Sequence, residues 1–81
     1  MGKRPMKEEV EHWFSQAQEK SPAATIGPML ESSQALWREG DIRAAWWIVE
    51  AIKKTYLLHP RYDQAFVDAL GRLGAALNKL A

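Results

Sequence analysis

The chain contains no cysteine among its 81 residues. That absence excludes disulfides, thiolate-bound metals and a cysteine nucleophile, and it favours a reducing, cytoplasmic setting. Only two histidines, His12 and His59, are present, and they lie in separate predicted segments. Because acid–base catalysis and metal binding both need titratable groups that can meet, the sequence predicts neither catalytic residues nor a metal site.

Long apolar runs and nucleotide-binding motifs are also missing. The longest uncharged apolar run, near Trp46, is far too short to cross a bilayer, so no membrane contact is expected. Glu8, Glu9 and Glu11 stand where a signal peptide needs an apolar stretch, so no export signal is expected. No glycine-rich phosphate loop, Gly-x-Ser-x-Gly or His-Glu-x-x-His motif occurs. The sequence therefore predicts a protein that is not an enzyme, with no cofactor and no small-molecule substrate.

What is present is the composition of a small globular protein. Apolar residues make up 47% of the chain and charged residues 26%, which predicts one folded domain spanning residues 1–81. At this length a single hydrophobic core supplies little net stability, so oligomerisation or partner binding is favoured. The formal net charge of +1 provides no global attraction to nucleic acid, so any such binding requires a local patch.

Apolar residues recur at helical spacing in four segments, and no alternating strand pattern appears. These segments are roughly 5–20, 26–39, 41–58 and 61–80. Since the connections between them are short, the sequence predicts an all-α bundle of about four helices arranged as antiparallel helical hairpins. Residues 1–4 are expected to be flexible.

The joint between the second and third segments carries clear end signals. Gly40 readily takes the left-handed conformation that ends a helix, and Asp41 is a good N-cap for the next one. For the start of the second helix, Thr25 and Gly27 are alternative N-caps. The last helix is expected to start at Arg61 or Tyr62.

Two glycines, Gly71 and Gly74, lie inside the fourth predicted helix. A glycine in a helix interior costs about 1 kcal/mol relative to alanine. We therefore expect these glycines to let another helix approach closely.

The run ALWREGDIRAA around Gly40, followed later by Pro60, resembles the turn of a tetratricopeptide repeat, over residues 26–60. Gly40 matches the turn glycine of that family, Ala45 the alanine of the second helix, and Pro60 the closing proline. Ser33 departs from the pattern, since a glycine or alanine is usual there, and the stretch after Gly40 is too long. The resemblance implies a helical hairpin that binds a peptide or protein.

The four tryptophans are the strongest functional signal, because tryptophan is enriched among binding hot spots. Trp13, Trp37 and Trp46 lie on the main apolar stripes of their helices and are expected in the core. Trp47 lies about 100° around the helix from Trp46, so both cannot face one layer. A second packed helix covers it, or it is an exposed anchor for a protein partner or a second copy. The residues of this partner-binding surface are Trp47, Ile48, Ala51 and Leu58.

The favoured hypothesis is thus a small interaction module, an adaptor, inhibitor or subunit, that binds a protein or itself through an apolar face of the third and fourth helices. The alternative is a nucleic-acid-binding regulator with a basic N-terminal arm. Its phosphate-contacting residues would be Lys3, Arg4, Lys7, Lys53 and Lys54.

Overall fold

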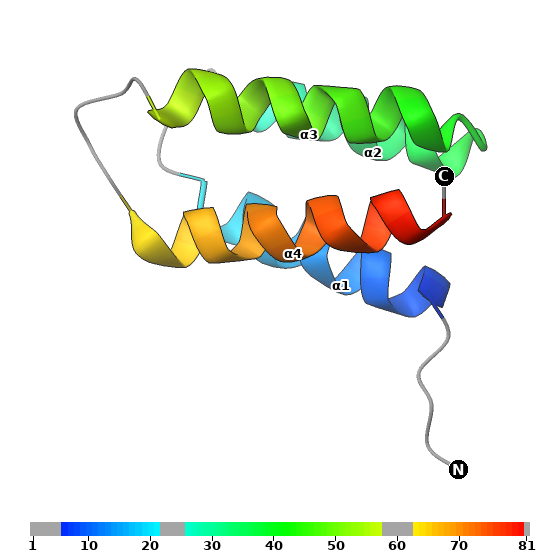
Figure 1. Ribbon diagram of the computed structural model, residues 1–81, viewed down its shortest axis with the longest axis horizontal. Coiled ribbons are helices and arrows are strands. Elements are labelled where there is room, and N and C mark those ends of the chain that lie inside the picture. The colour runs from blue at the N-terminus through cyan, green and yellow to red at the C-terminus, as the bar shows by residue number, and fades with distance from the viewer. Residues whose placement is uncertain (1–5, 22–25, 58–62, 81) are drawn as a thin grey trace, which may run out of the picture.

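A computed structural model describes residues 6–21, 26–57 and 63–80 of the chain (Figure 1). These residues form helices and no strand, which confirms the predicted all-α bundle. The helices are α1 (Met6–Glu19), α2 (Ile26–Arg38), α3 (Ile42–Leu57) and α4 (Gln64–Leu80). Their bounds lie within three residues of the predicted ones.

The helices alternate in direction and form two layers (Figure 1). α2 packs along α3 in one layer, and α1 packs along α4 in the other. The layers meet where α3 lies against α4 and, over a smaller contact, where α1 lies against α2. α1 and α3 are diagonal to each other, with no contact between their described residues. The α1–α4 pairing joins the two ends of the chain and was not predicted.

The joint between α2 and α3 has the predicted geometry. Gly40 has a φ of +92°, its N–H donates to the carbonyl of Trp37 at 3.0 Å, and the N–H of Asp41 donates to that of Leu36 at 2.9 Å. These two bonds satisfy the last carbonyls of α2 in the pattern of a Schellman motif. Asp41 then caps α3, since its Oδ1 accepts from the N–H of Ala44 at 3.2 Å.

The starts of α2 and α4 differ in detail from the prediction. α2 begins at Ile26, so Gly27 lies inside its first turn and is not the N-cap, while Thr25 lies outside the described residues. α4 begins at Gln64 and not at Arg61 or Tyr62. Its N-cap is Asp63, whose Oδ1 accepts from the N–H groups of Ala65 and Phe66 at 3.0 and 3.4 Å. An aspartate there satisfies free donors and suits the positive end of the helix.

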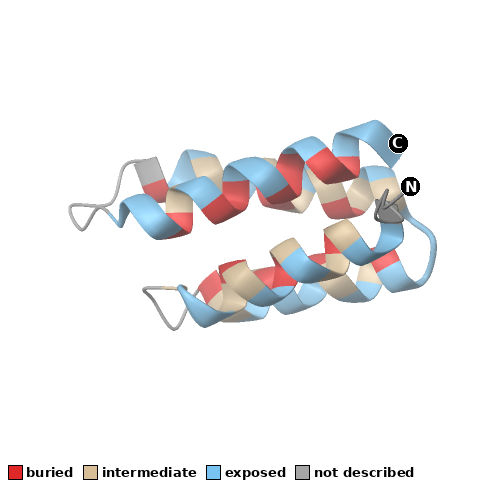
Figure 2. Cartoon of the chain, turned by 90° about the horizontal axis from the view of Figure 1, so that it is seen from below, coloured by how far each residue is buried: buried red, intermediate tan, exposed pale blue. Residues whose placement is uncertain are grey.

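The core is apolar and receives residues from all four helices (Figure 2). Phe14 of α1 meets Trp37 of α2 with ring centroids 6.0 Å apart. Tyr56 of α3 meets Phe66 of α4 edge to face at 5.0 Å. Both aromatic contacts therefore join a helix of one layer to a helix of the other.

Ser33 is a polar residue inside this core, fully buried between α2 and α3. Its Oγ donates to the carbonyl of Ala45 at 2.8 Å. The bond satisfies the hydroxyl, and the small side chain lets the two backbones lie close together.

Of the three tryptophans expected in the core, only Trp37 is buried, with 7% of its surface exposed. Trp13 and Trp46 are half-buried and pack against the core from its edge. The guanidinium of Arg72 lies over the ring of Trp13, 5.2 Å from the ring centroid, in a cation–π contact. The apolar stripe of each helix correctly predicted that Trp13 and Trp46 face the core, but not that they lie at its edge.

The two glycines of α4 behave differently. Gly74 is buried against α3, where an added Cβ would lie 3.8 Å from a methyl of Val49 and 3.6 Å from Oε2 of Glu50. An added Cβ at Gly71 would meet nothing within 4 Å. The expectation of a close helix approach is therefore wrong for Gly71.

Candidate protein interface

The solvent-facing side of α3 carries an exposed tryptophan at its middle. Trp47 has 64% of its surface exposed, whereas its neighbours Ala45 and Val49 are fully buried. At 100° per residue, Trp47 points directly away from the buried stripe of α3. Of the two alternatives for this residue, cover by a second helix is thus excluded within the described part of the molecule.

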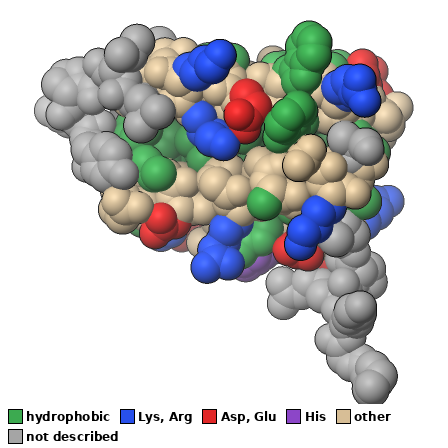
Figure 3. Space-filling view, viewed as in Figure 1, with side chains coloured by type: hydrophobic (Ala, Val, Ile, Leu, Met, Phe, Trp, Pro, Cys, Tyr) green, Lys and Arg blue, Asp and Glu red, His purple; other side chains and the backbone are tan. Residues whose placement is uncertain are grey.

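We define the α3 outer face by the residues that share this direction. They are Arg43, Ala44, Trp47, Glu50, Ala51 and Lys54. All are exposed except Ala44 and Glu50, which are half-buried at its two sides. Hydrophobic side chains stand between charged ones over α3 in Figure 3. Two alanines, Ala44 and Ala51, lie within about one turn of Trp47, so its immediate neighbours on this face are small and apolar.

The four residues predicted for the partner-binding surface are distributed as follows. Trp47 and Ala51 lie together on the α3 outer face. Ile48 is half-buried and packs against the core, so it offers a partner only part of its side chain. Leu58 lies outside the described residues. On α4, Leu80 is the other exposed large hydrophobic residue of the described chain, at 36%.

Two cations frame Trp47, and sequence reasoning did not assign them to this surface. Arg43 and Lys54 form no ion pair with any described residue. Glu50, the nearby acid, is held instead by Lys53, with Nζ 2.8 Å from its Oε2. The α3 outer face is therefore apolar at its centre and positive at both ends. The sequence signal that could have assigned them is their spacing, since Arg43 lies four positions before Trp47 and Lys54 seven after it, on one side of a helix.

Of the five residues predicted for nucleic-acid binding, the three that the structure describes do not form one patch. Lys3 and Arg4 lie outside the described residues, and Lys7 is exposed on α1. Lys53 is half-buried and paired with Glu50, whereas Lys54 is exposed. Adjacent residues point about 100° apart on a helix, so these two lysines face different directions.

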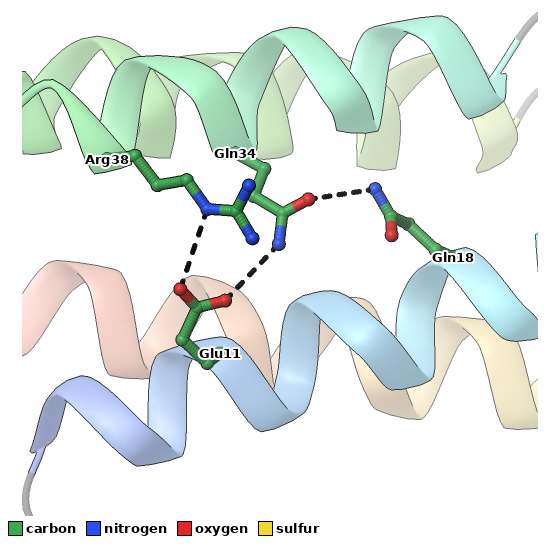
Figure 4. A network of polar contacts seen from close by, with 4 residues as sticks. All are labelled: Glu11, Gln18, Gln34 and Arg38. Carbon is green, nitrogen blue, oxygen red and sulfur yellow. Dashed lines mark hydrogen bonds and ion pairs between the residues drawn. The ribbon is translucent and has the colours of Figure 1, made fainter.

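A polar network joins α1 to α2 on another side of the bundle (Figure 4). Glu11 accepts from Nε2 of Gln34 at 3.3 Å, and its other oxygen lies 3.6 Å from Nε of Arg38. Gln18 donates to Oε1 of Gln34 at 3.2 Å. Both carboxylate oxygens of Glu11 are engaged, so the network holds the two helices together and offers no free acid or base.

A cavity of about 140 Å³ lies between α3 and α4, with a lining that is almost wholly apolar. The residues that line it are Lys53, Tyr56, Val67, Leu70 and Gly71. Because Gly71 has no side chain, the wall of the cavity is left open at that position. The polar groups of the lining residues are engaged, since Lys53 is paired with Glu50 and the hydroxyl of Tyr56 accepts from the N–H of Asp63.

In the described ranges, no group of three or more histidines, aspartates and glutamates could hold a metal ion. Glu9 and His12 form the single Glu-x-x-His of the sequence, and the ring of His12 lies edge-on to Trp13 at 4.7 Å. None of the described helices is long and apolar enough to cross a membrane.

No family model, curated protein or solved structure matches this chain. The tetratricopeptide resemblance of residues 26–60 stays a prediction.

Proposed function

We propose that this protein is an interaction module, without catalytic activity, that binds a protein partner through the α3 outer face. The observation that carries the proposal is the 64% exposure of Trp47. Leaving a large aromatic side chain in water forgoes burial that a partner could supply, and tryptophan is the residue type most enriched in binding hot spots. A rim of polar or charged groups around an apolar centre is the usual anatomy of a protein interface.

The surroundings of Trp47 support the same function. Ala51 beside it makes the centre of the face apolar and shallow, while Arg43 and Lys54 at the ends can orient a partner electrostatically. A nucleic-acid regulator has less support, because Lys53 is paired with Glu50 and because the acidic side chains of α1 follow directly after the basic arm.

The test is capture of partners by immobilised protein from an extract of the source cells, with quantification by mass spectrometry. Trp47→Glu places a charge at the centre of the α3 outer face and should abolish capture. Leu80→Glu is the matched control, since it introduces the same charge at the other exposed large hydrophobic residue. Both variants should keep the helical circular dichroism of the parent. Capture that survives Trp47→Glu would refute the proposal.

A further inference from the structure

Two outward-facing helix surfaces of this molecule carry opposite charges at the same spacing. Eleven positions separate Arg43 from Lys54 on α3, and eleven also separate Glu8 from Glu19 on α1. All four side chains are exposed and none forms an ion pair with a described residue. On a helix, this spacing places each pair about 16 Å apart along the axis and about 20° apart around it.

An aromatic ring occupies the same place between the charges on both surfaces. Trp47 follows Arg43 by four positions, and His12 follows Glu8 by four. His12 is exposed, as Trp47 is. We call the surface of Glu8, His12 and Glu19 the α1 outer face.

On both helices the charged residues lie at the same angle around the helix axis from the buried residues. Each exposed residue of the α1 outer face precedes its counterpart on α3 by 35 positions, and the buried residues of the two helices are related by the same 35 positions. They are Val10, Phe14 and Ala17 on α1, and Ala45, Val49 and Ile52 on α3. Both outer faces therefore point directly away from the core, and the two sets of charges match without rotation of either helix.

These surfaces cannot meet within one molecule, since α1 and α3 lie diagonally across the bundle. The two helices run in the same direction (Figure 1). A second copy stacked in the same orientation would thus bring its α1 outer face onto the α3 outer face of the first.

We propose that the α3 outer face docks the α1 outer face of a second copy of this chain. The inference rests on the proposed interaction function and names its partner. Arg43 pairs with the second copy's Glu8, and Lys54 with its Glu19. His12 of the second copy packs against Trp47. After one contact the first copy keeps its α1 outer face free and the second keeps its α3 outer face free, so the contact is heterologous and adds copies head to tail.

The contact is weak and dependent on salt. One helix face against another buries less than the about 1,000 Å² of a stable interface. Its charge pairs are solvent-exposed, and the screening length falls from about 30 Å at 0.01 M salt to about 3 Å at 1 M. Association should therefore appear only at high protein concentration and low ionic strength.

The experiment is sedimentation velocity on the full chain, at protein concentrations up to about 1 mM, the range in which a weak contact is populated. The parent should show an average mass that rises above the 9.2 kDa monomer with concentration at low salt and returns to it at high salt. The variants are R43E/K54E, E8K/E19K and the fourfold combination of these changes. Each double variant should be monomeric, and the fourfold variant, which has the parent's net charge, should associate again.

Three outcomes would overturn this inference: a parent that stays monomeric at low salt, double variants that still associate, or a fourfold variant that does not recover. Binding of a single-stranded oligonucleotide that R43E/K54E abolishes, with no self-association, would also overturn it in favour of nucleic acid. If the parent is monomeric while Trp47→Glu still abolishes capture of another protein, only this inference fails and the proposed function stands.

Discussion

Two tryptophans, Trp37 and Trp47, should respond very differently to replacement by alanine. Trp37 is 7% exposed and packs between helices, whereas Trp47 is 64% exposed on the α3 outer face. If α3 presents Trp47 to a partner and not to the core, removing it should leave the fold almost intact.

The size of each effect follows from burial. Replacing a buried aromatic residue by alanine costs about 3–5 kcal/mol, which we expect for Trp37→Ala. At Trp47 about a third of the side chain is covered, or about 50–90 Å² of the 150–250 Å² that such a residue buries, worth about 1–2 kcal/mol. The unfolded chain already covers part of that area, and alanine has the higher helix propensity. The net cost of Trp47→Ala is therefore about 1 kcal/mol.

Urea unfolding followed by far-ultraviolet circular dichroism measures both costs. For a chain of this length the total free energy of unfolding is about 4–12 kcal/mol, so Trp37→Ala removes a large part of it. The denaturant slopes of parent and Trp47→Ala should agree. A loss at Trp47→Ala as large as that at Trp37→Ala would mean that the indole belongs to the core, and the reasoning would be refuted.

Three further changes test the helix ends and interior by thermal unfolding. Gly71→Ala should stabilise by about 0.5–1 kcal/mol, because the new methyl meets nothing within 4 Å; destabilisation would contradict the open wall. Gly40→Ala should destabilise by about 1–2 kcal/mol, since alanine is strained at a φ of +92°; an unchanged midpoint would exclude that conformation. Asp63→Ala should cost about 1 kcal/mol, and Asp63→Asn much less, if the carboxylate caps α4.

Local signals in the sequence predicted much of the fold. Apolar periodicity indicated four helices, and the pair Gly40 and Asp41 indicated the joint between α2 and α3, because both signals depend only on neighbouring residues. Asp63 is also a good N-cap by residue type, but the predicted start of the last helix was Arg61 or Tyr62, directly after Pro60. Pairing of α1 with α4 depends on contacts between distant parts of the chain, which no local pattern encodes.

The candidate interface was predictable only in part. Helical geometry showed that Trp46 and Trp47 could not share a layer, but the position of neighbouring helices decided which one was covered. Helical spacing alone places Arg43 and Lys54 on the side of Trp47. That their positive charge is not cancelled there required knowing that Glu50 is bound by Lys53.

The most direct test of the α3 outer face as a binding surface is site-specific photo-crosslinking. A photoreactive phenylalanine analogue would be placed at position 47, and at position 80 as the matched control. Position 47 should give a crosslinked product with a defined second protein, or with residues near His12 of a second copy, at a yield well above that of position 80. Equal yields from the two positions, or none from position 47, would contradict the assignment of this face.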